Sequence, residues 1–235
     1  MYLDRTEPLV FIYRFRFPRK RVDIAVRLNP QTLHVVGDGA KEPASWCRLE
    51  HHQCPNCPLQ RKEHPFCPVA ANLEDVVVRF KNMISFKRVE LTVSRGPRHV
   101  SKKTTAADGL ASLMGIYMAG SGCPILDRLR PMLLTHTPFA SGIETFYRSF
   151  STQLMRQFFV RRGGGRPDWT QRGMERAAQE VQTVNRAFAK RLVNAGMKDA
   201  VLNGLAQLDA FANLIDEPLL SAELDRVQKF FRPGA

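Results

Sequence analysis

The chain has 235 residues, of which 44% are apolar and 24% charged, a composition typical of a folded protein with a substantial core. No apolar run reaches the about 18 residues that a membrane span needs, and the polar N-terminus lacks the layout of a signal peptide, so we expect a cytoplasmic protein with no membrane contact. The net charge of +13 admits nucleic acid as a partner, although the basic residues are spread along the chain.

The N-terminal segment predicts a β-hairpin. Apolar and polar side chains alternate over residues 9–17 and again over 22–28, with a basic turn between the two runs. A period of two is typical of strands that bury one face. Arg14 and Arg16 on the outer face are interpreted as solvated, with phosphate contacts as the alternative. Residues 32–36 are compatible with a short third strand.

A helix and a further strand are predicted after a cysteine-rich loop. Apolar residues recur at helical spacing over 68–81, and Pro68 suits the first turn of a helix. Alternation over 88–95 predicts another strand. The fold class is therefore α+β. Residues 1–95 form a small antiparallel sheet with one helix and a cysteine-rich metal loop at 47–67.

The remaining chain is predicted to be helical. Residues 96–107 are interpreted as a mobile basic linker, and 108–162 as a helical region that packs on the first unit, with its first cap at Asp108. Beyond a glycine-rich break, 168–235 form a C-terminal helical bundle. Its wide apolar stripes need partners from this chain or from another, so a protein partner or self-association through these helices is possible.

The cysteine loop contains two local pairs of soft metal ligands. Cys54 and Cys57 lie on one tight turn, and His64 and Cys67 form the second pair, which gives the spacing C-x2-C-x6-H-x2-C. Such pairs are typical of a tetrahedral zinc site. Unligated cysteines in a packed loop are the simpler interpretation.

Cys123 is the alternative fourth ligand. It resembles Cys54, Cys57 and Cys67 in being followed by proline, which keeps the preceding residue out of the helical region. Cys67 and Cys123 are therefore expected at helix N-caps, where the helix dipole favours a thiolate. A four-cysteine set suits zinc or an iron–sulfur cluster and leaves His64 outside the site. The sequence leaves both ligand sets open.

The chain also resembles a family of uncharacterised bacterial proteins that begin with a β-hairpin. The resemblance rests on the run Gln53-Cys-Pro-Asn-Cys-Pro-Leu59 with Cys67-Pro68, and on Ser121-Gly-Cys-Pro124 with Thr135-His-Thr-Pro-Phe139 and Glu144-Thr-Phe-Tyr-Arg148. It covers roughly residues 10–160, so the last 70 residues lie outside it. It implies no known activity.

Three functional hypotheses follow from these patterns. The first is an intracellular metal-binding module, with zinc as the metal, that works by binding a partner. The second is a redox or sulfur-chemistry enzyme that uses an iron–sulfur cluster or a reactive Cys123. The third is nucleic-acid binding through the hairpin arginines and the basic segment. No catalytic residue can be named, because His136 and Glu144 are more simply explained as a helix-end residue and a cap.

Overall fold

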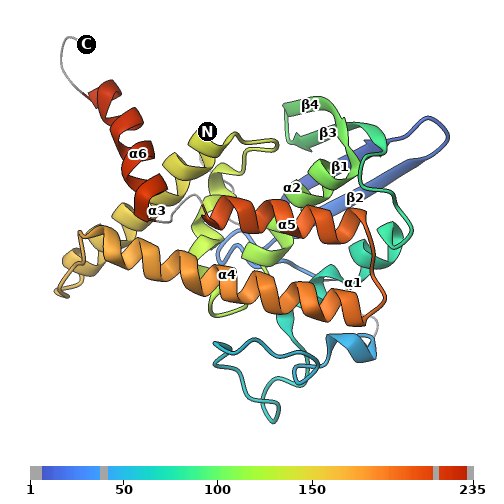
Figure 1. Cartoon of the computed structure of the whole chain (residues 1–235), viewed down its shortest axis with the longest axis horizontal. Coiled ribbons are helices and arrows are strands. Elements are labelled where there is room, and N and C mark those ends of the chain that lie inside the picture. Colours follow the sequence, from blue (N-terminus) through green and yellow to red (C-terminus); the bar gives the residue numbers. More distant parts are fainter. Residues whose placement is uncertain (1–6, 38–41, 214–216, 232–235) are drawn as a thin grey trace.

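The computed structural model describes residues 7–37, 42–213 and 217–231 as a four-stranded antiparallel sheet combined with helices (Figure 1). The sheet has the order β2-β1-β3-β4, with β1 Leu9–Arg16, β2 Arg21–Leu28, β3 Arg88–Arg95 and β4 Arg98–Thr105. The helices are α1 Pro68–Phe80, α2 Ala106–Ala119, α3 Gly142–Arg162, α4 Gln171–Asn194, α5 Ala200–Asn213 and α6 Glu217–Gln228. Three 3-10 segments are Ser45–Cys47, Leu126–Thr135 and Lys229–Phe231. The predicted α+β class with a C-terminal helical part is confirmed.

The predicted hairpin is confirmed with its expected buried face. Tyr13 pairs with Ile24 of β2 on one side and with Val93 of β3 on the other, and all three side chains are buried. The central position of β1 explains its row of aromatic residues, since this strand has neighbours on both edges. The predicted third strand at 32–36 is wrong, because that segment forms only one isolated bridge, between Leu28 and Val35.

The interpretation of 96–107 as a mobile linker is wrong. The two residues Gly96 and Pro97 turn the chain, and β4 then pairs with β3 from Arg98 to Thr105. Gly96 has a φ of +54°, a conformation that favours glycine. The sequence does not predict β4, because this strand lies at the edge of the sheet and exposes its side chains from Arg98 to Lys103. It therefore lacks the alternation of apolar and polar residues that is typical of a half-buried strand.

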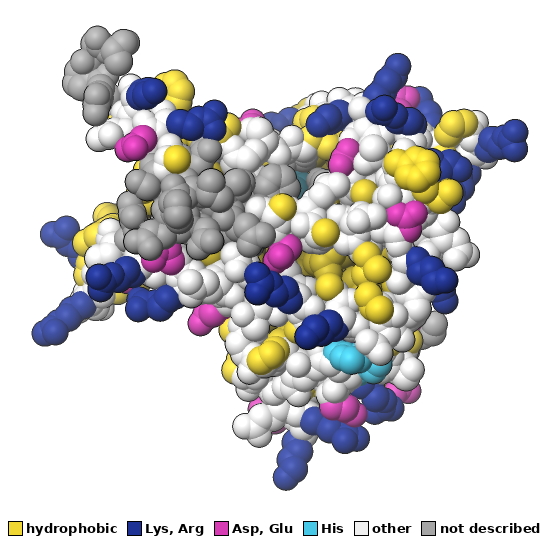
Figure 2. All heavy atoms as spheres, in the orientation of Figure 1, with side chains coloured by type: hydrophobic (Ala, Val, Ile, Leu, Met, Phe, Trp, Pro, Cys, Tyr) yellow, Lys and Arg dark blue, Asp and Glu magenta, His cyan; other side chains and the backbone are white. Residues whose placement is uncertain are grey.

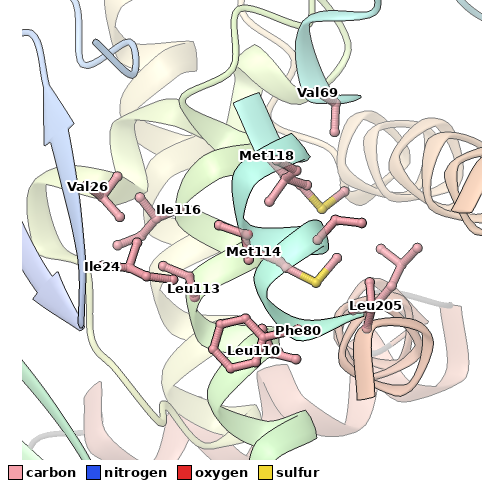
Figure 3. Packing of buried hydrophobic residues seen from close by; sticks show 14 of the residues in the cluster. Ile24, Val26, Val69, Phe80, Leu110, Leu113, Met114, Ile116, Met118 and Leu205 are labelled. Atoms are coloured by element: carbon pink, nitrogen blue, oxygen red, sulfur yellow. The ribbon is translucent and has the colours of Figure 1, made fainter. Parts of the chain in front are cut away.

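Helix α2 is the centre of the molecule. Figure 3 shows Leu113 and Ile116 facing the strand that carries Ile24 and Val26, while other α2 side chains, such as Met114, face α1 and α5. Because α2 contacts both the sheet and the C-terminal helices, it joins the two halves of the fold. The C-terminal helices therefore pack on this chain, at least through α4 and α5.

The first turn of α2 differs slightly from the prediction. Thr105, not Asp108, is the N-cap, and Asp108 completes a capping box three residues later. The Asp108 backbone N–H donates to Thr105 Oγ1 at 3.2 Å, and the Thr105 backbone N–H donates to the Asp108 carboxylate at 3.3 Å. The last residue of β4 thus begins α2 directly, which fixes the angle between strand and helix.

Among the described residues, no helix combines the length and the apolar character needed to cross a bilayer. The described part of α3 nevertheless exposes several large apolar side chains near its C-terminal end. These exposed residues are Met155, Phe158, Phe159 and Val160.

Two glycines of α2 provide a matched test of how closely this helix approaches the sheet. A Cβ at Gly109 would lie 2.7 Å from Phe15 Cε1, whereas a Cβ at Gly115 would meet only Leu208 Cδ2 at an ordinary 3.5 Å. Alanine normally stabilises a helix interior by about 1 kcal/mol relative to glycine. We expect Gly115→Ala to raise the free energy of unfolding, and Gly109→Ala to lower it by about 1–3 kcal/mol through overpacking. Denaturant unfolding measures both, and a stabilising Gly109→Ala would contradict the packing.

Candidate metal centre

The cysteine loop is closed at its base by backbone hydrogen bonds. The Cys67 N–H donates to the Cys47 carbonyl at 2.8 Å, and the Leu49 N–H donates to the Pro65 carbonyl at 3.0 Å. Between these points the chain forms an irregular loop that projects from the body below α4 (Figure 1). The two ends of the loop are therefore held together before any metal is considered.

Three of the predicted ligands lie where their local sequence places them. Cys54 and Cys57 lie on one turn, in which the Cys57 N–H donates to the Cys54 carbonyl at 3.0 Å. Cys67 is the N-cap of α1 in an extended conformation, with Pro68 in the first turn, as predicted. Both arrangements follow from the Cys-Pro dipeptides, which exclude the helical region at each cysteine.

Cys123 departs from the prediction. It is not an N-cap, because the following 3-10 segment begins at Leu126 with Ile125 as its cap. Its thiol nevertheless accepts hydrogen bonds from the backbone N–H groups of Ile125 and Leu126, which lower its pKa. Burial has the larger effect and raises the pKa of Cys123 above its ordinary value. The two backbone hydrogen bonds thus favour the thiolate of Cys123, but less strongly than desolvation opposes it.

Asn72 links the two chain segments that carry Cys67 and Cys123. It lies in α1, and its side-chain amide donates to the Pro68 carbonyl at 2.8 Å and to the Ser121 carbonyl at 3.4 Å. The first of these acceptors is next to Cys67, and the second precedes Cys123 by two residues. One side chain thus connects the start of α1 to the segment that follows α2.

The thiols of Cys54, Cys57, Cys67 and Cys123 lie within electrostatic range of one another. Burial and, after it, the neighbouring thiols of Cys67, Cys123 and Cys57 raise the pKa of Cys54 to about 12. Cys67 and Cys57 also raise the pKa of Cys123, less than burial does. Cysteines from three separate segments therefore affect one another's ionisation, and all of them are free of disulfides.

His64 and Cys47 do not share this arrangement. His64 is exposed on the loop, and none of the cysteine pKa shifts has His64 among its causes. Cys47 is buried, and its thiol donates to the Glu74 carboxylate at a sulfur–oxygen distance of 3.9 Å. Burial, then Glu74 and to a smaller extent the neighbouring Cys67 thiol, raise the pKa of Cys47 to about 12. Cys47 thus lies near Cys67 as well, and it differs from the other four cysteines in having a carboxylate partner.

Arg191 of α4 holds the loop against the C-terminal helices. Its side chain is only 2% exposed, and it donates to the backbone carbonyls of Trp46, Arg48 and Leu49 at 2.8, 2.7 and 3.1 Å. Asn56 adds a second contact, from its amide to the Glu180 carbonyl at 3.0 Å. Backbone carbonyls of an irregular loop need such donors, because no sheet or helix supplies them.

Arg191 also supplies the positive charge nearest the thiols. Its guanidinium lowers the pKa values of Cys47 and Cys54, against the larger effect of burial. Among the described residues, no carboxylate forms an ion pair with it. A buried charge without a counter-ion is costly. The site therefore combines four thiols with one uncompensated cation.

The sequence analysis missed Arg191, although a signal for it exists. The residue occupies the apolar stripe of α4, in which Val184, Phe188 and Leu192 are all buried. A charged residue within such a stripe is exceptional, because lysine and arginine are rarely buried without a partner. Its target could not be deduced, since the three carbonyls belong to a loop more than 140 positions away.

The structure does not contain a ready-made ligand cage. Among the residues it describes, no group of three or more His, Cys, Asp or Glu side chains is positioned to hold a metal ion. A metal bound by the four thiols would therefore have to turn at least some of these side chains toward a common centre. The turn at Cys54 lies on an exposed loop that can accommodate such a movement.

Comparison with known proteins identifies a family. A family model described as "Domain of unknown function (DUF6901)" matches residues 11–232. The chain belongs to the DUF6901 family. This confirms the resemblance to an uncharacterised family, but the predicted extent is wrong, because the match also includes the C-terminal helices. No curated protein and no solved structure gives a significant match. The DUF6901 match contains all five cysteines and Arg191.

A pair of substitutions on α4 tests the role of Arg191 in this DUF6901 protein. Arg191→Met removes the donors of three buried carbonyls, and hydrogen bonds to charged groups contribute about 1.5–3 kcal/mol each. We expect a loss of at least about 3 kcal/mol in denaturant unfolding. Arg186→Met removes an exposed arginine of the same helix and should change stability by less than about 0.5 kcal/mol. Equal effects of the two substitutions would contradict this role.

Proposed function

We propose that the protein is a metal-binding module in which Cys54, Cys57, Cys67 and Cys123 hold one zinc ion as thiolates. The observation that supports this ligand set is the mutual electrostatic effect of these four thiols, near a buried arginine that lacks a carboxylate partner among the described residues. Four thiolates on Zn²⁺ carry two net negative charges. Arg191 would compensate part of that charge, and the metal site would in turn provide the counter-ion that Arg191 lacks.

The loop itself needs what a structural metal provides. Between the Ser45–Cys47 segment and α1, Leu49 is the one fully buried apolar side chain before Cys67, so apolar packing does little to order this segment. Metal binding contributes directly to folding in such cases. A closed four-ligand site is also typical of structural zinc rather than of catalytic zinc, which keeps one position open.

The alternatives have weaker support. A reactive thiolate at Cys123 is disfavoured, since burial raises the pKa of this thiol and thiolate is the nucleophilic form. An iron–sulfur cluster would use the same four cysteines and is separated from zinc by its iron content and colour. Nucleic-acid binding is disfavoured at the hairpin, because Arg14 pairs with Asp23 at 3.6 Å and Arg16 with Glu90 at 3.8 Å.

The charge distribution also gives little support to a nucleic-acid interface on the face drawn in Figure 2. On that face the Lys and Arg side chains are spread around the molecule, with Asp and Glu side chains among them. A nucleic-acid interface usually gathers its basic residues into a patch or stripe. Action through a protein partner stays a prediction from the sequence.

Metal analysis of variants separates the two ligand sets. We expect wild-type protein and His64→Ala, purified without oxygen, to contain one equivalent of zinc. Cys123→Ser and Cys54→Ser should lose it and melt at a temperature lower by roughly 10 °C or more. Iron with acid-labile sulfide in place of zinc would show that the site holds an iron–sulfur cluster instead of a zinc ion. Zinc retained by Cys123→Ser but lost by His64→Ala would overturn the ligand set, and wild-type protein that binds no metal would overturn the proposal.

The pH dependence provides an independent test. In the metal-free fold, burial raises the pKa of Cys54 from 9.0 to about 12, so this thiol stays protonated where the unfolded chain already ionises. The protonated Cys54 thiol therefore contributes its full share to the free energy of unfolding below pH about 9, and this share is lost as the pH rises toward about 12. Zinc binding requires thiolates, so it should release protons and strengthen as pH rises from about 6 to about 9. Chelator competition and calorimetry in different buffers measure both effects. Affinity that is independent of pH would contradict thiolate ligation.

A further inference from the structure

A second candidate site lies away from the cysteine loop. A cavity of about 440 Å³, partly open to solvent, is lined mainly by residues of α2, the Leu126–Thr135 segment, α3, α4 and α5. None of its described lining residues belongs to the loop or to the four-cysteine set. Its volume falls in the range of small-molecule sites.

The wall of the cavity is mainly apolar. Side chains that face one another across it come from elements far apart in the sequence. They include Met118, Leu126, Leu133, Val181 and Leu208. Such a wall favours a ligand with a hydrocarbon part, because burial of apolar surface is the main source of affinity in a preformed site.

Among the described lining residues, positively charged side chains outnumber negatively charged ones, and they differ in whether they form ion pairs. Lys102, Arg128 and Arg148 line the cavity together with the single carboxylate of Asp108. That carboxylate already accepts hydrogen bonds from Thr104 at 2.5 Å and from Gln207 at 2.9 Å. Arg128 forms an ion pair with Glu180. Lys102 is exposed, and its Nζ lies 5.7 Å from the centroid of the Phe139 ring. Arg148 is therefore the partly buried cation of the wall whose charge needs explanation.

Arg148 is half-buried and lacks a partner at its buried Nε. It donates from Nη2 to the Met132 carbonyl at 2.8 Å, while its buried Nε has no hydrogen-bond partner. Within the described part of the chain, no carboxylate lies at ion-pair distance from it. Burial lowers its pKa, and Glu144 only partly opposes this effect. An anion beside this side chain would supply both the missing charge and a missing acceptor.

Neutral polar groups surround the same end of the cavity. His136 and Ser112 line it, and Tyr13 Oη lies 2.6 Å from His136 Nε2 and 3.1 Å from Ser112 Oγ. Burial and, after it, the neighbouring Arg148 and Arg95 lower the pKa of His136 to about 3. Burial raises the pKa of Tyr13. Both groups are therefore neutral near pH 7 and do not compensate the charge of Arg148, and His136 and Ser112 line the cavity as polar groups.

We propose that this cavity binds a small amphipathic monoanion, a hydrophobic carboxylate, with its carboxylate at Arg148 and its hydrocarbon against the apolar wall. One uncompensated arginine fits a single negative charge, and guanidinium and carboxylate match in geometry. The proposal is independent of the metal centre, because the two sites share no described residue.

Three ligands with the same chain length test the charge requirement. Calorimetry on the full-length protein as purified compares decanoate with uncharged decanol and with the cationic decyltrimethylammonium. We expect one decanoate per chain, and affinity at least about tenfold above that of decanol, the difference expected for one charge-assisted contact. The cation should not bind. Absence of decanoate binding, or equal affinity for decanoate and decanol, would overturn the proposal.

Substitutions then assign the preference to one residue. Arg148→Met should abolish the preference for decanoate over decanol, whereas Arg148→Lys should retain part of it. Arg162→Met, at the exposed end of the same helix, is the matched control and should leave both affinities unchanged. If Arg148→Met does not fold, Arg148→Lys and the ligand series still decide the matter. A folded Arg148→Met that keeps the full preference would contradict the proposed contact.

Discussion

The hydrogen bonds from Arg191 to the carbonyls of Trp46, Arg48 and Leu49 are the constraint on which the candidate metal centre depends. A guanidinium presents its donors in a rigid planar fork, so one side chain can fix three backbone groups of an irregular segment. The same side chain places a positive charge beside the thiols. One side chain thus contributes both to the backbone order of the loop and, to a smaller extent than burial, to the electrostatics of the cysteines.

The rest of the fold serves to bring distant segments to this point. The sheet supports α2, and the chain leaving α2 passes Gly120, whose carbonyl accepts from the Val35 N–H at 2.8 Å. That contact and the two hydrogen bonds of Asn72 place Cys123 near Cys67. Helix α5 packs on α2 through Gly204, where an added Cβ would lie 3.2 Å from the Ala111 backbone nitrogen. Helix α4 pairs with α5 and carries Arg191 to the loop.

Apolar periodicity in the sequence predicted most of the strands and helices. The features that it did not predict depend on contacts between segments far apart in the chain. The hairpin, α1 and β3 could be predicted because their buried faces impose a period on the sequence. β4 could not, since an edge strand with exposed residues on both faces has no apolar alternation. The Cys-Pro dipeptides led to the grouping of Cys123 with the loop cysteines, which stays a prediction. The contact of Asn72 that links the segment before Cys123 to α1 is identified by no sequence pattern.

The two candidate sites differ in what the sequence revealed of them. The cysteines were conspicuous by residue type and spacing, whereas the cavity beside Arg148 is formed by five elements and has no local signature. His136 was interpreted as a helix-end residue, yet it contacts Tyr13 in the first strand. Contacts between residues more than 100 positions apart are a property of the packed fold and cannot be obtained from spacing.

X-ray absorption spectroscopy of the zinc-loaded protein tests the central claim most directly, because it counts the atoms bound to the metal. The account predicts four sulfur neighbours at about 2.3 Å and no imidazole signal. Three sulfurs with one imidazole nitrogen would contradict it, since that result would return His64 to the site and leave Cys123 outside it.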